Sequence, residues 1–317
     1  MNPIDPVSYR TLGGPVASAS SGIRVDLYLS REYPFLSRAL WQKRLKDGEV
    51  LINGRVVRSS HTLKEHDVVH MYHVIEDEPE VNEEVEFLWE EGGILAVMKP
   101  APLPMHENGP YRKKTLAKIV QDRFGLEWAA VHRLDRETSG IVLCAATPEI
   151  RRKLSEAFEE HRVQKEYTAI ACGVAAERSW ICEAPIGAAS DSKIRIKKWV
   201  NFEDGLSART DFVVRGCKDE KWTLLHAMPK TGRTNQIRVH AAFSGLPLLG
   251  DKMYHGNEEV FLKFYASGNT DEVKSMAGFP RHCLHASMIE FKHPENGRNC
   301  LIQSPMAPDM KNFWELP

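Results

Sequence analysis

The chain has 317 residues, 42% of them hydrophobic, so it can bury a sizeable core, and this length suits two domains better than one. Its apolar runs are interrupted by charge well short of the roughly twenty residues that a membrane span needs, and residues 1 to 22 lack the apolar stretch of a signal peptide. We therefore expect a cytoplasmic protein without a membrane span. The formal net charge of -1 does not exclude an anionic partner, because a local basic surface is enough to bind one.

The cysteines are scattered and mostly lie within apolar runs, which is typical of reduced core thiols. They are Cys144, Cys172, Cys182, Cys217, Cys283 and Cys300. The nearest approach to a metal motif is His282-Cys283-Leu284-His285, which lacks a second pair of ligands and is better explained by packing. We expect no bound metal.

The chain begins with small and polar residues, 1 to 22, which we expect to form a disordered tail. A compact first domain is predicted over residues 23 to 75. In this domain Ser37 can cap a helix that runs to residue 46, and Asn53-Gly54 between two short apolar pieces is a strong hairpin signal. A further strand is predicted at residues 68–71.

Basic side chains are concentrated on the predicted helix of this domain, at Arg38, Lys43 and Arg44. They are candidates for contacts with RNA phosphates, although an ordinary solvated helix face would have the same composition. Residues 76 to 91 carry nine acids and no base, so this block masks a basic remainder. We interpret residues 76 to 84 as an acidic linker.

The second domain, residues 85 to 317, is predicted to combine many strands with few helices. Strands are expected at residues 94–98, 141–145, 165–171, 209–214 and 222–228, and helices at residues 115–124 and 148–160, with 234–243 a further candidate. A proline-stiffened loop over residues 99–106 cannot be helical. The pattern favours an α+β fold with a mixed, largely antiparallel sheet and flanking helices.

One segment of this domain alternates strictly, Lys193-Ile194-Arg195-Ile196-Lys197. Successive side chains of a strand point to opposite faces, so a strand here would place Lys193, Arg195 and Lys197 together on one face. A nucleic acid could lie across that basic face.

Charge in an apolar setting is most concentrated at residues 132 to 140, where Asp135 stands between Arg133 and Arg136. The pattern indicates a cleft that holds an anionic substrate against a positioned carboxylate, and the alternative is a surface loop with solvated ion pairs. A second charged stretch with apolar neighbours, residues 230 to 240, contains Arg233 and Arg238.

Two enzyme classes are disfavoured because their motifs are missing. A Ser-His-Asp hydrolase would need a Gly-x-Ser-x-Gly turn, and Thr138-Ser139-Gly140 lacks its first glycine. A nucleotide-hydrolysing enzyme would need a glycine-rich phosphate loop, which the sequence does not contain. A glycosidase-like reaction on a nucleoside needs one or two carboxylates near an anomeric carbon, and Asp135 is a candidate for one of them.

The first domain resembles the small RNA-binding module first described in ribosomal protein S-four. The resemblance rests on Arg24-Val25-Asp26-x-x-Leu29, Ser37-Arg38, Lys46-x-Gly48-x-Val50-x-Ile52-Asn53-Gly54 and Asp67-Val68-Val69. His66 stands where that family has a glycine. The resemblance implies a small α/β domain that binds RNA.

The second domain resembles the RluA-type RNA pseudouridine synthases. Their signature is matched by His132-Arg133-Leu134-Asp135-x-x-Thr138-Ser139-Gly140, and four further pieces lie in the family's order. These are Lys99-Pro100-Ala101 with Leu103-Pro104-x-His106; Lys165-x-Tyr167; Thr231-Gly232-Arg233-Thr234-x-Gln236-Ile237-Arg238-Val239-His240; and Leu249-Gly250-Asp251-x-x-Tyr254 followed by Leu284-His285-Ala286. The resemblance implies the pseudouridine synthase fold, with a central active-site cleft, and isomerisation of uridine within RNA.

The same resemblance implies roles for individual residues. Asp135 matches the catalytic aspartate, which acts either as nucleophile at the anomeric carbon or as base toward the neighbouring ribose proton. Arg238 matches the arginine that pairs with this aspartate, and Tyr167 matches the tyrosine that stacks on the flipped base. Arg133 is expected to fill the gap that the uridine leaves in its stack.

Further RNA contacts are expected from Arg136, Lys165 and Arg233. The implied reaction includes no redox or group-transfer step, so no cofactor is expected, and the histidines at 132, 240 and 285 are expected to make structural hydrogen bonds. The expected substrate is large-subunit ribosomal RNA, with transfer RNA as the alternative, and the expected state is a monomer.

Two departures from the family pattern concern loops. Pro102 replaces the usual glycine and Asn235 replaces the usual histidine, and either change could alter loop shape or RNA contacts. A second hypothesis is an RNA-binding or ribosome-assembly protein with a vestigial isomerase site. A third, a nucleoside hydrolase on small substrates, is disfavoured because it would have no use for the RNA-binding module.

Overall fold

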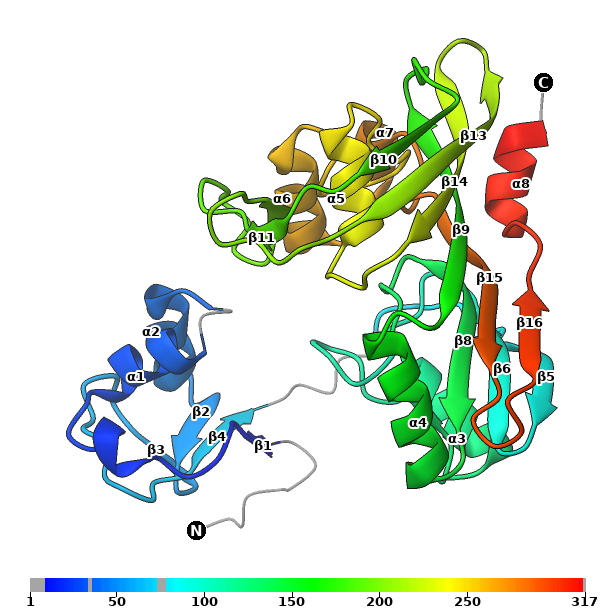
Figure 1. Cartoon of the computed structure of the whole chain (residues 1–317). Coiled ribbons are helices and arrows are strands. Elements are labelled where there is room, and N and C mark those ends of the chain that lie inside the picture. The colour runs from blue at the N-terminus through cyan, green and yellow to red at the C-terminus, as the bar shows by residue number, and fades with distance from the viewer. Residues whose placement is uncertain (1–8, 34–35, 73–77, 316–317) are drawn as a thin grey trace. The chain divides into compact units, whose positions relative to one another are not determined.

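The structure is a computed structural model that describes residues 9–33, 36–72 and 78–315 (Figure 1). It divides into two compact units, Met1–Asp77 and Glu78–Pro317. Across the described ranges, no helix is both long and apolar enough to cross a membrane. All six cysteines are free thiols.

The first unit packs two helices against a small antiparallel sheet with the strand order β1-β4-β2-β3. Its elements are β1 (Tyr9–Thr11), the short 3-10 helix η1 (Ser18–Ser20), α1 (Val25–Glu32), α2 (Arg38–Lys46), β2 (Val50–Ile52), β3 (Arg55–Val56) and β4 (Val69–Tyr72). The predicted cap is confirmed, because the Ser37 hydroxyl accepts a hydrogen bond from the backbone N–H of Leu40. The predicted hairpin is also confirmed, with positive φ at Asn53 and Gly54 between β2 and β3.

The prediction of a disordered tail over residues 1 to 22 is wrong from Tyr9 on, and residues 1–8 lie outside the described residues. Strand β1 pairs with β4, and the Val16 side chain is buried in the core of the unit. A short edge strand and one apolar anchor order this segment despite its polar composition. Helix α1, at residues with no helical prediction, supplies Val25 and Leu29 to the same core.

The basic residues of α2 are less free than predicted. The guanidinium of Arg38 donates to the fully buried carboxylate of Asp26, which also accepts from Gln42 and from Arg24. Arg38 therefore holds α1 against α2. Arg44 lies 3.3 Å from Glu49, and Lys43 is exposed.

The second unit is built on a sheet of ten strands within residues 78 to 315 (Figure 1). The strand order is β10-β13-β14-β9-β15-β8-β6-β5, with β16 paired to β15 and β7 paired to β8. Only the β8 and β15 pair is parallel in this described range, so the prediction of a mixed, largely antiparallel sheet is confirmed. The strands are β5 (Glu86–Glu91), β6 (Ile94–Lys99), β7 (Ala129–Ala130), β8 (Ser139–Ala145), β9 (Gln164–Cys172), β10 (Ser179–Cys182), β13 (Thr210–Lys218), β14 (Trp222–Pro229), β15 (Leu284–Lys292) and β16 (Asn299–Gln303). Strands β11 (Ile186–Ala188) and β12 (Lys198–Val200) pair separately.

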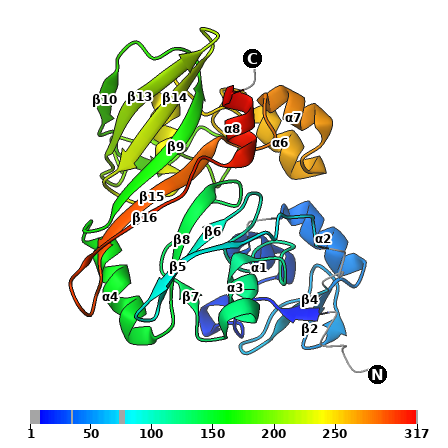
Figure 2. The ribbon, with the colours of Figure 1, turned by 90° about the vertical axis from the view of Figure 1, so that its right-hand side faces the viewer.

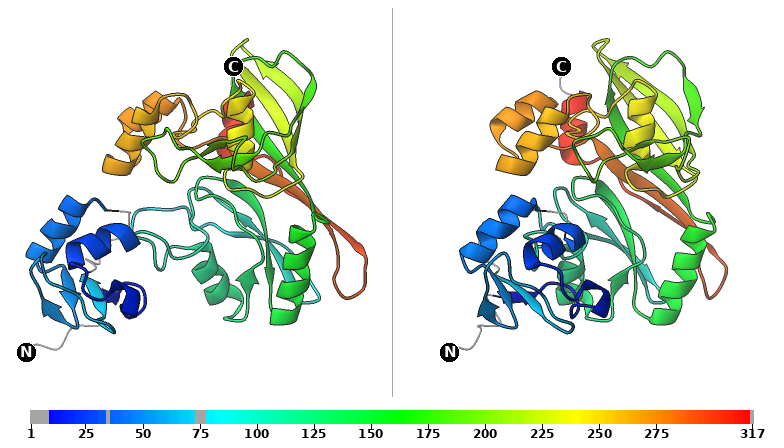
Figure 3. Two further views of the ribbon diagram at one scale, coloured as in Figure 1. Left: turned by 60° about the vertical axis from the view of Figure 1, so that its left-hand side comes forward. Right: turned by 90° about the vertical axis from the view of Figure 1, so that its left-hand side faces the viewer.

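Helices cover both faces of this sheet. In one half, α4 (Pro148–Glu159) packs Leu154 on one face of β6 and β8, and α3 (Leu116–Phe124) packs Val120 on the other (Figure 3). In the other half, α5 (Gln236–Phe243) and α8 (Pro308–Glu315) lie on opposite faces of β9 and β14. The long strands β9 and β15 join the halves (Figure 2). Helices α6 (Glu258–Ser267) and α7 (Asp271–Ala277) pack on each other.

The predicted strand at residues 193–197 is wrong. The segment is a turn in the loop between β11 and β12, with Ile194 buried and Ile196 66% exposed. Glu258 of α6 holds the turn, because its carboxylate accepts from the Ser192 hydroxyl and the Lys197 ammonium. Lys193 and Arg195 are exposed on this turn, and Lys197 forms an ion pair with Glu258.

Part of the predicted acidic linker belongs to the second unit. The Glu78 carboxylate accepts from the backbone N–H groups of Lys113 and Lys114, and Asn82 donates to the carbonyl of Pro102. Residues 76 and 77 lie outside the described residues. The acidic segment from Glu78 on is therefore packed against the second unit and does not act as a spacer.

Candidate active site

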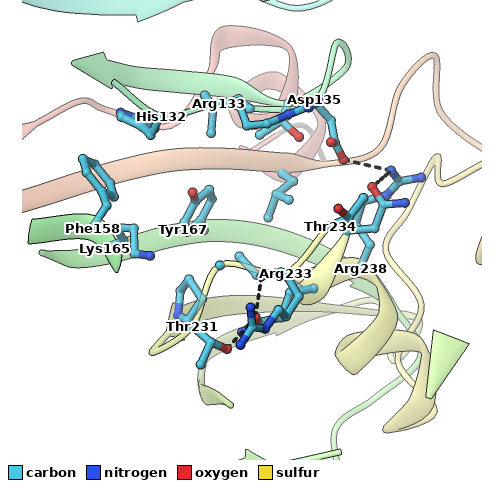
Figure 4. A pocket seen from close by; sticks show the side chains of 18 of the residues that line it. His132, Arg133, Asp135, Phe158, Lys165, Tyr167, Thr231, Arg233, Thr234 and Arg238 are labelled. Carbon is cyan, nitrogen blue, oxygen red and sulfur yellow. Dashed lines mark hydrogen bonds and ion pairs between the residues drawn. The ribbon is translucent and has the colours of Figure 1, made fainter. Parts of the chain in front are cut away.

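A cavity of about 570 Å³ lies in the second unit where three stretches meet (Figure 4). They are the loop between β7 and β8, the end of α4 with the start of β9, and the loop from β14 into α5. Its lining includes His132, Arg133, Asp135, Phe158, Lys165, Tyr167, Thr231, Arg233, Asn235 and Arg238. Asp135, Tyr167 and Arg238 are thus brought together from three separate parts of the sequence.

Asp135 and Arg238 form the ion pair at the centre of this site. Atom Oδ2 of Asp135 lies 2.9 Å from Nη1 of Arg238, and the two side chains are 29% and 10% exposed. The other edge of the guanidinium donates to Asp251, from Nε to Oδ2 at 2.6 Å and from Nη2 to Oδ1 at 2.8 Å. This bidentate contact fixes the plane of the guanidinium and directs Nη1 at Asp135.

The charges of this cluster support one another. Burial lowers the pKa of Arg238, but the attraction of Asp251 and Asp135 outweighs burial, so its pKa is raised well above the ordinary value. Burial raises the pKa of Asp251, but Arg238 and the backbone N–H groups of Met253 and Tyr254 lower it by more, so its net pKa is depressed. Both groups are charged at neutral pH.

Tyr167 comes from β9 and lies between the Asp135 end of the pocket and the end formed by Phe158 and Lys165 (Figure 4). Burial, together with the nearby charge of Asp135, raises the pKa of its phenol, so the side chain is neutral at physiological pH. It can present a ring face to a base and donate or accept one proton.

The three motif histidines make structural hydrogen bonds, as predicted. His132 Nε2 accepts from the backbone N–H of Leu143, and burial followed by the charge of Lys165 lowers its pKa to about 3. His240 lies between the Thr210 hydroxyl and the carbonyl of Ala184. His285 lies between the hydroxyls of Ser139 and Ser304.

Buried charged side chains hold the loop that carries Asp135. No role was predicted from the sequence for these residues, which are Lys99, Glu137 and Lys252. Lys99 donates from Nζ to the carbonyls of Pro100, Leu103 and Arg136. Glu137 accepts two hydrogen bonds from Lys252, at 2.9 and 3.0 Å. These contacts hold the two residues that follow Asp135.

The last residue of the signature, Gly140, must be glycine for a steric reason. Gly140 has φ +121°, and a Cβ atom there would lie 2.3 Å from the carbonyl oxygen of Ala286 on the parallel neighbour β15. The close approach of β8 and β15 next to the loop that carries Asp135 therefore requires glycine.

Gln236 organises the opposite wall of the pocket. Its side-chain oxygen accepts from the Thr231 hydroxyl and the Arg233 backbone N–H, and its amide nitrogen donates to the Arg209 carbonyl and the Thr210 hydroxyl. Gln236 and Asp251 both belong to the family motifs quoted in the sequence analysis. Nothing else in the sequence pointed to a role for either residue.

The predicted RNA-binding residues divide into two groups. Arg133, Lys165 and Arg233 line the pocket. Arg136 does not, because it donates to the Tyr111 hydroxyl and Glu137 and lies over the ring of Phe264. The remaining candidates are outside the pocket lining and are Lys193, Arg195, Lys197, Arg38, Lys43 and Arg44.

Among residues 9–33, 36–72 and 78–315, the structure contains no cluster of three side chains suited to hold a metal ion. The observed groups support acid, base or nucleophilic chemistry by a carboxylate next to a stackable ring.

Comparison with known families matches both units. The family model described as RNA pseudouridylate synthase matches residues 93–243, and the S4 domain matches residues 23–69. The S4 match spans all the quoted pieces of the first domain, and the synthase match spans those of the second domain except residues 249–254 and 284–286.

Relatives match over nearly the whole chain. A ribosomal large subunit pseudouridine synthase D of Xanthomonas campestris pv. campestris is 30% identical over 311 residues, which cover 94% of this chain and 90% of the relative. A ribosomal large subunit pseudouridine synthase C of Pasteurella multocida is 30% identical over 317 residues, which cover 94% and 91%. An uncharacterized RNA pseudouridine synthase of Aquifex aeolicus is 33% identical over 305 residues, which cover 92% of each chain.

Solved structures with the same fold include two human proteins. Human RNA Pseudouridylate Synthase Domain Containing 1 gives a TM-score of 0.55 at 24% identity and covers 70% of this chain and 84% of its own. Human RNA Pseudouridylate Synthase Domain Containing 4 gives 0.56 at 22% identity and covers 71% and 90%. At this identity the likeness concerns the fold, and it agrees with the architecture predicted from the sequence.

Proposed function

Because this chain belongs to the RluA-type RNA pseudouridine synthases and carries an S4 domain ahead of its catalytic domain, we propose that it isomerises uridines of large-subunit ribosomal RNA through Asp135. The observation that carries the proposed role of Asp135 is its 2.9 Å ion pair with Arg238 in a pocket that Tyr167 also lines.

The proposed reaction begins when a uridine turns out of its stack into the pocket. Turning out a base costs a few kcal/mol, and the exposed Arg133 at the rim is suited to fill the space that the base leaves. The ring of Tyr167 then stacks on the uracil, and Lys165 and Arg233 contact the RNA backbone. Phosphate contacts of this kind position the RNA without reading its sequence.

The chemistry breaks the bond between N1 of uracil and the anomeric carbon of ribose. Asp135 starts this step, either by attack at the anomeric carbon or by removal of the neighbouring ribose proton. Both roles need an oriented carboxylate, and the hydrogen bond from the fixed Nη1 of Arg238 sets the direction of the Asp135 side chain. Uracil then turns and its carbon 5 bonds to the anomeric carbon, while either the ester bond to Asp135 breaks or the ribose proton returns from Asp135. The hydrogen on carbon 5 is lost, N1 gains one, and the carboxylate of Asp135 is regenerated.

The choice of ribosomal RNA rests on the relatives, two of which are named as synthases of the ribosomal large subunit. An S4 domain is consistent with a structured RNA partner. We propose that the protein acts in the cytoplasm as a monomer.

The test is a map of pseudouridines in large-subunit ribosomal RNA transcripts treated with the wild type or with Asp135→Asn. Carbodiimide-dependent stops in primer extension are expected at specific uridines with the wild type only. The substitution keeps the shape of the side chain and removes its charge. Stops on transfer RNA transcripts but not on ribosomal RNA would replace the proposed substrate, and equal stops with both proteins would refute the role of Asp135.

A further inference from the structure

Asn235, which stands where the family has histidine, lies directly before helix α5 in the left-handed conformation, with φ 57° and ψ 18°. Its side chain does not cap the helix. Its Oδ1 atom instead accepts from Nη1 of Arg238 at 3.1 Å, and its Nδ2 atom donates to the Tyr254 hydroxyl at 3.0 Å. The residue therefore bridges the catalytic arginine and a buried tyrosine.

The hydrogen bonds of Arg238 show why this bridge matters. A guanidinium has five N–H donors, two of them on Nη1. Asp251 takes one from Nε and one from Nη2, and the two on Nη1 point to Asp135 and Asn235. Asp135 and Asn235 thus share Nη1 of Arg238 as their donor.

The orientation of the amide follows from the same count. Arginine can only donate, so the amide oxygen must face Arg238 and the amide nitrogen must face Tyr254. The Tyr254 hydroxyl also accepts from the backbone N–H of Lys198 at 3.3 Å, and its ring lies 5.0 Å from the guanidinium carbon of Arg238. Tyr254 is 4% exposed, so this support is rigid.

We propose that Asn235, supported by Tyr254, is a positioning residue that keeps Arg238 in place during the step in which Asp135 loses its charge. Both roles open to Asp135 neutralise it, because attack at the anomeric carbon forms an ester and removal of a ribose proton forms a carboxylic acid. Nη1 of Arg238 then loses its charged partner, and Asn235 remains as its acceptor. The inference rests on the proposed role of Asp135.

The family's usual histidine can perform the same task. A neutral imidazole has one acceptor and one donor, as the amide bridge requires, and histidine tolerates the left-handed conformation better than most residues. The replacement by asparagine therefore preserves the bridge and does not mark a vestigial site.

The experiment compares Asn235→Gly, Asn235→His and Tyr254→Phe under single turnover on an RNA that the wild type modifies. Glycine adopts the left-handed conformation without strain, so Asn235→Gly removes the side chain alone. The loss of one hydrogen bond to a charged group is expected to lower the rate constant about tenfold. The KM and the affinity for RNA are expected to stay unchanged. Asn296→Ala, in the exposed turn between β15 and β16, is the matched control.

Asn235→His is expected to restore most of the wild-type rate. The double variant Asn235→Gly with Tyr254→Phe is expected to lose less than the product of the single effects, because both changes break one bridge. A wild-type rate for Asn235→Gly, a loss that appears only in KM, or an Asn235→His variant as slow as the glycine variant would overturn the inference. Asp135→Asn in the same assay separates the two claims, since activity in that variant would refute the proposed function instead.

Discussion

Replacing the buried carboxylate of Asp251 by an amide should destabilise the catalytic unit strongly. Asp251 is fully buried and accepts four hydrogen bonds, two from the Arg238 guanidinium and two from the backbone N–H groups of Met253 and Tyr254. In Asp251→Asn, an amide NH₂ would face an N–H of Arg238, and the buried arginine would lose its main counter-charge. Breaking one partner of a buried ion pair costs about 3–5 kcal/mol.

That loss is a large fraction of the roughly 5–15 kcal/mol by which a typical domain is stable. Urea unfolding followed by tryptophan fluorescence measures it as a shift of the transition midpoint. The control is Asp271→Asn, whose carboxylate is 98% exposed and pairs with Lys274 on the surface, and its midpoint should stay at the wild-type value. Equal midpoints for Asp251→Asn and the wild type would refute the assignment of Asp251 as the anchor of Arg238.

The same pair predicts a pH dependence. The pKa of Asp251 is depressed in the folded chain, so its contribution is present at neutral pH and is lost as the pH falls below the ordinary aspartate range toward the folded pKa. The stability difference between the wild type and Asp251→Asn should therefore shrink at acidic pH. A difference that grows on acidification would contradict the sign of the shift.

Three further outcomes are expected. Gly140→Ala should lower the melting temperature markedly, because its Cβ would lie 2.3 Å from the Ala286 carbonyl oxygen, and an unchanged melting curve would exclude that clash. Lys252→Met should destabilise the unit by about 3 kcal/mol in urea unfolding, because it leaves the buried Glu137 carboxylate without its ammonium partner; a stability within the scatter of the wild type would refute this. Binding of RNA, measured by fluorescence anisotropy, should weaken steeply between about 50 and 200 mM salt if several phosphates are contacted, and a flat response would argue against basic contacts.

Local patterns predicted most of the elements that carry the site. The predicted strands at residues 94–98, 141–145 and 165–171 became β6, β8 and β9, and the predicted helices at 115–124 and 148–160 became α3 and α4. These segments have strong periodicity and begin with good caps, such as Thr115 and Thr147, which accept backbone hydrogen bonds. Their structure is decided by residues close in sequence.

The wrong predictions concern segments whose structure depends on residues distant in sequence. The alternating pattern at residues 193–197 reads as a strand, but Glu258 of α6 holds it as a turn. Residues 9 to 16 look disordered by composition, but β4 provides an edge for β1. Asp251 and Lys252 showed no chemistry of their own, because their partners Arg238 and Glu137 lie 13 and 115 positions away.

The candidate site was predicted partly by charge and mainly by resemblance. Charge in an apolar setting pointed to Asp135 and Arg238, and the family pieces supplied Tyr167. The pocket-facing position of Arg133 and the inward position of Arg136 could not be separated by spacing, because the two residues have the same chemistry. The difference arises from Tyr111 and Phe264, which surround Arg136 alone.

The central claim is that Asp135 carries out the isomerisation of uridine in RNA, and release of tritium from carbon 5 of uracil tests it most directly. Carbon 5 loses its hydrogen when it bonds to ribose, so each isomerised uridine of a labelled ribosomal RNA transcript releases one tritium to water. The wild type should release tritium up to a fixed number of sites, and Asp135→Asn, with its RNA affinity intact, should release none. Release by Asp135→Asn at the wild-type rate would contradict the account.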